Sequence, residues 1–172
     1  MRTKKRTATG VKRQTPVNIV TAVLEGYAEK AVFRGFSAPS QRGGKATYRM
    51  AWHYDRPFEM GLDVLEKTLQ FTEVLPGVPV RSAMYRELRA FLKSQQSPQT
   101  PEHRRVNPAK ARVTLSNQGG SVSLKLTVKD GDFEYAARKI VHIVHEIFMV
   151  FLVDGPYYEY MVQQLGLDPD RF

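Results

Sequence analysis

The segment His142-x-x-His145-Glu146 contains residue types that commonly ligate transition metals. Residues at i and i+3 share one face of a helix, so His142 and His145 could bind one metal ion, with Glu146 as a further ligand. The histidine spacing of metalloproteases is i, i+4, and no third ligand is fixed by spacing here. The alternative is a polar flank on a half-buried helix, and on that interpretation we expect no cofactor.

The segment Gln41 to Lys45 (QRGGK) could bind a phosphate through backbone amides and two cations. It lacks the spacing of a Walker motif and a following helix, so we interpret it as a flexible loop. The chain has no cysteine, which excludes thiol catalysis and Cys-ligated zinc. It also has no G-x-S-x-G or G-x-G-x-x-G motif, and no pattern in it argues for an enzyme.

Lysine and arginine residues could form a surface for a polyanion such as nucleic acid. The net charge is +9, and residues 1–14 contain six cations and no acid. Three further cations recur at intervals of three and four on a predicted helix, opposite its apolar face. Together with the N-terminal residues they could form one basic surface, or they could simply be a solvated face. The residues of this hypothetical surface are Arg2, Lys4, Lys5, Arg6, Lys12, Arg13, Arg86, Arg89, Lys93, Arg104 and Arg105.

Aromatic residues near the C-terminus suggest a different kind of surface. Tyr157, Tyr160 and Met161 lie on one side of a predicted short helix, and aromatic residues and methionine are enriched at protein interfaces. The alternative is that these side chains cap the core.

The longest apolar-periodic segment is Asp132 to Val153, and it must position the two histidines. Apolar residues recur there every three or four residues, which predicts a helix. Asp132 is its expected N-cap, Glu134 and Arg138 form an i, i+4 pair, and Asp154-Gly155-Pro156 ends it. Its C-terminal part, from Ile147, is apolar at nearly every position, so we expect burial on most sides.

Other segments predict three more helices and five strands. Thr15 and Ser82 are expected N-caps, and the clearest hairpin joins two alternating segments across Asn117-Gln118-Gly119-Gly120. The predicted elements are a helix from 16 to about 34, a loop at 37–44, strands at 47–54, 58–64 and 68–72, an apolar loop at 74–80, a helix at 83–95, an exposed connection at 94–107, strands at 112–116 and 122–128, and a C-terminal helix at 156–165.

This order predicts an α+β fold with a five-stranded antiparallel sheet and helices packed on one face, in the order α-β-β-β-α-β-β-α plus a short C-terminal helix. One face of each strand is apolar and the other polar, as expected for a sheet covered on one side. We expect residues 1–14 to be a disordered basic arm and residues 15–172 to form a single domain.

The element order over residues 16 to 153 is similar to that of type III secretion chaperones and of bacterial regulators that share their fold. The segments GGKATYRMAWHYDRPFEM and ARKIVHIVHEIF also resemble an uncharacterised bacterial protein family. The resemblance implies a bacterial, chaperone-like binding protein. Type III chaperones are typically acidic and dimeric, however, whereas this chain is basic.

We therefore expect a non-catalytic bacterial binding or adaptor domain whose partner is a protein or a second copy of the chain. The alternative is a nucleic-acid-binding protein that uses the basic arm and the face of Arg86, Arg89 and Lys93. The basic N-terminus is not followed by an apolar segment, and no apolar run is long enough to span a bilayer. We accordingly expect no membrane contact and a cytoplasmic location.

Overall fold

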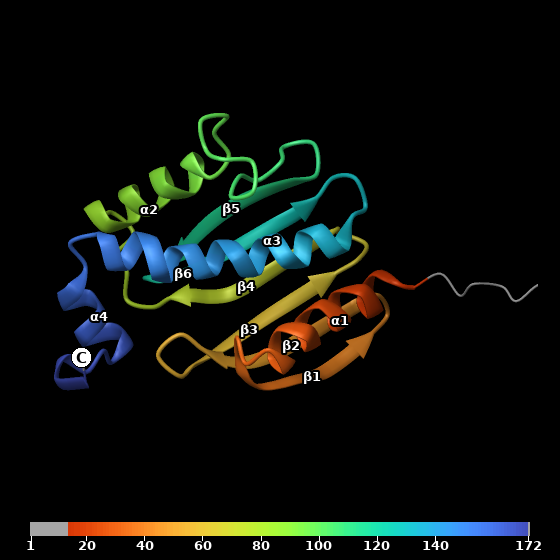
Figure 1. Ribbon diagram of the computed structural model, residues 1–172, viewed down its shortest axis with the longest axis horizontal. Coiled ribbons are helices and arrows are strands. Elements are labelled where there is room, and N and C mark those ends of the chain that lie inside the picture. Colours follow the sequence, from red (N-terminus) through yellow and green to blue (C-terminus); the bar gives the residue numbers. More distant parts are fainter. Residues whose placement is uncertain (1–13, 172) are drawn as a thin grey trace, which may run out of the picture.

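In the computed structural model, which describes residues 14–171, six antiparallel strands form one open sheet in the order β1-β2-β3-β4-β6-β5 (Figure 1). The strands are β1 (Arg34–Arg42), β2 (Lys45–Trp52), β3 (Arg56–Asp63), β4 (Thr68–Leu75), β5 (Ala111–Gln118) and β6 (Ser121–Val128). The fold is α+β, as the sequence predicted. The strands β1 to β4 form a meander, and β6 of the second hairpin pairs with β4.

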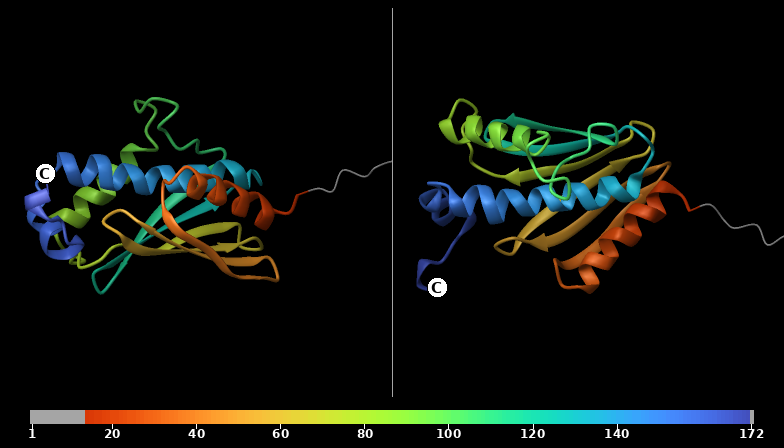
Figure 2. Two further views of the ribbon diagram at one scale, coloured as in Figure 1. Left: turned by 60° about the horizontal axis from the view of Figure 1, so that its bottom comes forward. Right: turned by 45° about the horizontal axis from the view of Figure 1, so that its top comes forward.

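The helices lie on one face of this sheet. They are α1 (Pro16–Glu29), α2 (Ala83–Ser94), α3 (Phe133–Glu146) and α4 (Tyr158–Leu165), with a π-helical segment η1 (Ile147–Leu152) and a 3₁₀ turn η2 (Pro169–Arg171). The helices α1 and α3 pack against each other over the sheet, whereas α2 lies toward β5 and α4 lies beyond the C-terminal end of α3 (Figures 1 and 2).

The period-2 pattern of the strands separates the core from the open face of the sheet. Tyr48, Met60, Phe71 and Leu124 are fully buried beneath the helices. Their sequence neighbours on the other face are polar and at least partly exposed, among them Arg49, Glu59, Thr72 and Lys125. Because the helix-facing side chains are apolar, burial of this face supplies most of the driving force for folding.

The first edge strand was not predicted. The sequence suggested a helix to about residue 34 and a loop at 37–44, but α1 ends at Glu29 and β1 occupies Arg34–Arg42. Most β1 residues are exposed, and the apolar alternation of the strand is limited to the partly buried Phe36 and Ala38. It also contains Pro39, and its register with β2 shifts twice. Gly43 and Gly44, which belonged to the possible phosphate loop, form the turn of the β1–β2 hairpin with φ of +62° and +76°.

The three predicted N-caps are present. The backbone N–H of Asn18 donates to Thr15 Oγ1 over 3.2 Å, and that of Tyr85 donates to Ser82 Oγ over 3.1 Å. The N–H of Tyr135 donates to Asp132 Oδ1 over 2.9 Å. Each bond satisfies one N–H that the first helical turn leaves without an intrahelical partner.

The central helix differs from the continuous α-helix that was predicted for residues 132–153. Regular α-helix ends at Glu146, and the next six residues form a π-helix. The wider turn of a π-helix places Phe148, Phe151 and Leu152 in the core together, while Met149 remains 51% exposed. Burial accounts for the apolar residues at these core positions but not for Met149 or for Val153, which is 54% exposed, so the expected burial on most sides is only partly present.

The connection after α2 is anchored to the core, although a fully exposed segment was expected. Val106 is completely buried, and its N–H donates to the carbonyl of Gln95 over 2.8 Å. Gln95 itself is also buried. Residues 1–13 of the predicted basic arm lie outside the described part of the chain.

Candidate functional site

Structural contacts involve Glu146 and His142, whereas His145 is exposed. Glu146 is buried, and its Oε2 accepts a hydrogen bond of 2.6 Å from Arg104 Nη2. Glu146 Oε1 lies 3.5 Å from His142 Nε2, and burial lowers the pKa of His142. Within residues 14–171, no group of three or more His, Cys, Asp and Glu residues has the arrangement needed to hold a metal ion.

The structure adds a histidine that the sequence analysis did not single out. The ring of His53 is stacked between Trp52, with centroids 4.5 Å apart, and Phe148, with centroids 4.3 Å apart. The ring centroid of His145 is 5.7 Å from that of His53. Burial, followed by the nearby His145 and Arg56, lowers the pKa of His53 to about 4. His53 is therefore neutral at pH 7 and acts as a packed aromatic ring.

His53 also borders a hollow of about 500 Å³ at the β1 end of the sheet, which residues 31–34, 51–55 and 166–168 line. Ala31, Tyr54 and Asp55 in its wall have positive φ, an uncommon conformation for residues other than glycine. Its walls include Phe33 and Trp52. At its rim Arg34 and Asp55 form an ion pair. This hollow, which we call the β1-end hollow, is therefore mainly apolar, with its rim charges paired.

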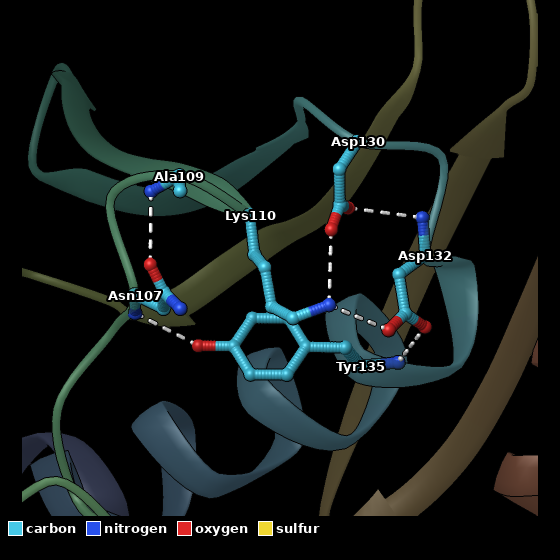
Figure 3. Close-up of polar contacts among 6 residues, drawn as sticks. All are labelled: Asn107, Ala109, Lys110, Asp130, Asp132 and Tyr135. Carbon is cyan, nitrogen blue, oxygen red and sulfur yellow. Dashed lines mark hydrogen bonds and ion pairs between the residues drawn. The ribbon is translucent and has the colours of Figure 1, made fainter.

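A polar network fixes the start of β5 to the start of α3 (Figure 3). Lys110 Nζ donates to Asp130 Oδ2 and to Asp132 Oδ2, both over 2.9 Å, and lies 5.2 Å from the centre of the Tyr135 ring. The Tyr135 hydroxyl accepts a 2.9 Å hydrogen bond from the N–H of Asn107. Hydrogen bonds from Lys110 to the two carboxylates raise the pKa of Lys110. Hydrogen bonds from Lys110 and from the N–H of Asp132 lower the pKa of Asp130, and hydrogen bonds from the N–H of Tyr135 and from Lys110 lower the pKa of Asp132. Each of the three charges in the network has a partner, and the formal net charge of the network is −1.

The three residues proposed as a protein interface pack inward. Tyr157 and Met161 are buried, and the Tyr157 ring lies 4.7 Å from that of Phe151. The Tyr160 hydroxyl donates to the carbonyl of Pro76, and the Tyr54 hydroxyl donates to Met161 Sδ over 3.4 Å. In the structure these side chains cap the core, which was the alternative interpretation.

The predicted cations of α2 do gather at one place. Arg86, Arg89 and Lys93 are exposed and line a groove of about 430 Å³ between α2 and β5. We call it the α2–β5 groove, and its lining residues are Arg86, Arg89, Ala90, Leu92, Lys93, Gln96, Val113, Thr114 and Leu115. Because β5 is the last strand of the sheet, one side of its backbone has no neighbouring strand.

These three cations have no carboxylate partner within the described residues, 14–171. Arg86 Nη1 donates to the carbonyl of Arg81 over 3.2 Å, and the Arg89 guanidinium lies 6.0 Å from the centre of the Tyr85 ring. Several other cations of the described residues do have such a partner: Lys45 pairs with Asp63, Arg49 with Glu59 and Arg104 with Glu146. The α2–β5 groove therefore has an uncompensated positive charge.

Of the other predicted cations, Arg104 and Arg105 do not line this groove. The structure uses Arg104 in its contact with Glu146, and Arg105 Nη1 donates to the carbonyl of Pro98 over 3.4 Å. The described part of the chain begins just before α1, on the side of the molecule opposite α2 (Figure 1). The N-terminal cations, Arg2 to Arg13, lie outside the described residues.

Among residues 14–171, no helix has the length and apolar character required to cross a membrane. No family model matches the chain, and neither a curated protein nor a solved structure matches it.

Proposed function

We propose that this chain is a non-catalytic binding domain whose partner is a protein, and that the partner docks in the α2–β5 groove. The observation that supports this most strongly is the coincidence of an edge strand, a groove and three cations without carboxylate partners. Exposed cations that lack partners gain most from a ligand that supplies carboxylates, because the complex then creates ion pairs that the free protein does not have.

The chemistry of the groove fits binding. Its walls combine guanidinium and ammonium groups with the amide of Gln96 and with apolar carbon from Leu92 and Leu115. Cations and amide groups orient a ligand, while apolar carbon gains free energy when a partner covers it. None of the lining residues is a carboxylate or a histidine, the usual groups for proton transfer at neutral pH.

The proposal is tested by fluorescence anisotropy with a labelled glutamate-rich peptide and with oligonucleotides of equal charge. The groove variant replaces Arg86, Arg89 and Lys93 by glutamine. We expect its affinity for the peptide to fall by about tenfold or more, since each exposed ion pair contributes up to about 1 kcal/mol and 1.4 kcal/mol is tenfold.

A matched control variant carries Lys30→Gln, Arg42→Gln and Lys67→Gln. These three cations are also exposed, but they do not line the groove. The control variant has the same net charge as the groove variant and is expected to bind like the wild type. Equal losses in both variants would show a non-specific charge effect and would contradict the proposed site.

Nucleic-acid binding is the second candidate function. Arg112 on β5 and Lys125 on β6 are exposed on the open face of the sheet, and neither forms an ion pair within the described residues. Together with the α2 cations they could contact phosphates. For duplex DNA, log K should fall against log salt concentration with a slope of about −0.9 for each phosphate neutralised.

Removal of residues 1–14 tests the contribution of the N-terminal cations to this second function. If oligonucleotides bind more tightly than the peptide at physiological salt, and binding weakens when the chain begins at Thr15, nucleic-acid binding replaces the protein-binding proposal.

A further inference from the structure

We propose that the α2–β5 groove accepts an extended, acidic segment of the partner protein as an additional strand beside β5. This rests on the proposed function and deepens it, because it specifies the conformation and the charge of the bound segment. Addition of a strand to a sheet edge is an established way for domains to bind peptides, in which backbone hydrogen bonds supply affinity and side chains supply specificity.

The hairpin geometry shows which backbone groups of β5 face the groove. Gly119 and Gly120 form a two-residue turn with positive φ, and the flanking residues Gln118 and Ser121 are paired. In such a hairpin the flanking pair exchanges hydrogen bonds, and bonded and non-bonded pairs alternate along the strands. The even-numbered residues of β5 therefore bond to β6.

A bond at the other end of the strand supports this assignment. The N–H of Lys129 donates to the carbonyl of Lys110 over 2.8 Å, in the same register. The odd-numbered residues Val113 and Leu115 consequently direct their N–H and C=O groups away from β6, and both residues line the groove. An extended segment placed there would lie beside backbone donors and acceptors of β5 that no other strand of the described sheet uses.

Part of this edge is buried in the free protein. Val113 is only 4% exposed, and its neighbours in the groove include the long side chains of Arg89 and Lys93. Charged side chains at a sheet edge discourage the addition of unrelated strands. A strand with carboxylates reverses this effect, because the cations can turn toward the carboxylates and uncover the edge.

The spacing of the cations matches that of an extended segment. Arg86, Arg89 and Lys93 occupy positions i, i+3 and i+7, so they extend over about 10 Å along the helix axis. Side chains on one face of a strand recur about every 6.7 Å. Acidic residues at alternate positions of the bound segment can therefore reach neighbouring cations, while the residues between them point to the open face.

The positive charge of the α2–β5 groove also disfavours two other possible occupants. If two copies of the chain paired through β5, their α2 cations would be brought toward each other, and like charges in proximity are unfavourable. The N-terminal segment 1–13 contains six cations and no acid, so the groove repels it as well. The charge of the groove is complementary to an acidic segment of another protein.

The test uses the full chain and a labelled ten-residue peptide that alternates glutamate with valine. A matched peptide has glutamine in place of glutamate. A third peptide keeps the glutamates but has N-methyl groups on alternate amides, which removes the donors along one edge. We expect the glutamate peptide to bind about tenfold more tightly than the other two.

Amide hydrogen exchange then identifies the binding mode. At a peptide concentration ten times the dissociation constant, exchange at Val113 and Leu115 should slow by about tenfold, because only free protein exchanges. Amides of Arg112 and Thr114, which bond to β6, should change little.

Other results would overturn the inference in distinguishable ways. If the N-methylated peptide binds as well as the unmodified one, and Val113 and Leu115 remain unprotected, strand addition is wrong while protein binding in the groove stands. If none of these three alternating peptides binds but the glutamate-rich peptide of the first test does, the cations protect the edge of β5 from an added strand. The partner then binds elsewhere. If no peptide binds at all, both proposals fail.

Discussion

The strands β1 and β5 are the two edges of one sheet, but only β5 keeps an uninterrupted register along its whole length. The register of β1 with β2 shifts twice, and β1 contains Pro39 and the left-handed Gly35. Irregular backbone and proline protect an edge from further strands. On β5 the corresponding protection comes from the cationic side chains of α2.

The hollows beside these edges differ in the same way. The β1-end hollow has aromatic walls and a paired rim, whereas the α2–β5 groove has cations without carboxylate partners. Backbone irregularity protects an edge against every partner, because no ligand can change it. Side-chain charge protects only against partners that lack the opposite charge. If the proposed function is correct, β5 is the edge at which an acidic partner binds.

Proline substitutions on β5 provide the strongest test of its regular edge. Thr114→Pro removes an N–H that bonds to β6 and should reduce the free energy of unfolding by about 3 kcal/mol. Leu115→Pro removes an N–H that faces the groove and should cost about 1 kcal/mol. Urea unfolding of both variants measures the difference. Equal losses of unfolding free energy in the two variants would contradict the inference that backbone N–H groups of β5 point alternately to β6 and to the groove.

Acidification tests the other end of the sheet, where His53 is packed between aromatic rings. The pKa of His53 is about 4 in the folded protein, below its ordinary value of 6.5. Neutral His53 thus contributes stability that is present above pH 6.5 and is lost as the pH falls toward 4. Between pH 7 and pH 5 the free energy of unfolding should fall by about 1 to 2 kcal/mol from this group.

The control for this effect is His53→Phe, which keeps an aromatic ring but cannot be protonated. Its unfolding free energy should depend less on pH over the same range, whatever its stability at pH 7. An unchanged pH dependence in the variant would show that His53 is not the responsible group.

Ala31→Gly should stabilise the β1 end modestly. Ala31 follows α1 with φ of +57°, and the N–H of Val32 donates to the carbonyl of Tyr27 over 3.0 Å. Glycine adopts this conformation without the steric cost of a Cβ, so the melting temperature should rise by an amount equivalent to about 0.5 to 1 kcal/mol. Ala28→Gly, inside the helix, is the matched control and should destabilise.

The smallest effect is expected for the α2 cations themselves. Replacing Arg86, Arg89 and Lys93 by glutamine removes no ion pair of the described structure, so the free energy of unfolding should change by less than about 0.5 kcal/mol. Thermal unfolding monitored by circular dichroism measures this. A large loss of stability would mean that the groove is a structural element and would weaken its assignment as a binding site.

The sequence predicted most of the fold, because its apolar periodicities are local. The β5–β6 hairpin follows from alternation around Gly119 and Gly120, and the N-caps Thr15, Ser82 and Asp132 follow from residue type and position. The edge strand β1 escaped prediction because only Phe36 and Ala38 of its nine residues pack against the core, and both are only partly buried. Two apolar residues between polar ones and a proline give too short a period-2 signal to identify a strand.

The candidate site was predictable only in part. Periodicity placed Arg86, Arg89 and Lys93 together on the exposed face of α2, and the structure keeps them together. That β5 forms the other wall depends on the pairing of β4 with β6, which no local pattern specifies. His53 was missed for a similar reason, because its stacking partner Phe148 comes from a distant helical segment.

The β4–β6 pairing has a further consequence for the order in which the chain folds. The meander β1–β4 and the hairpin β5–β6 each form between sequence neighbours across short turns. The ladder between β4 and β6, in contrast, closes a loop that contains α2 and the connection to β5. Loop-closure entropy makes such non-local contacts slow to form. We therefore expect two locally folded halves to form first and the central ladder to form last, which also completes the α2–β5 groove late in folding.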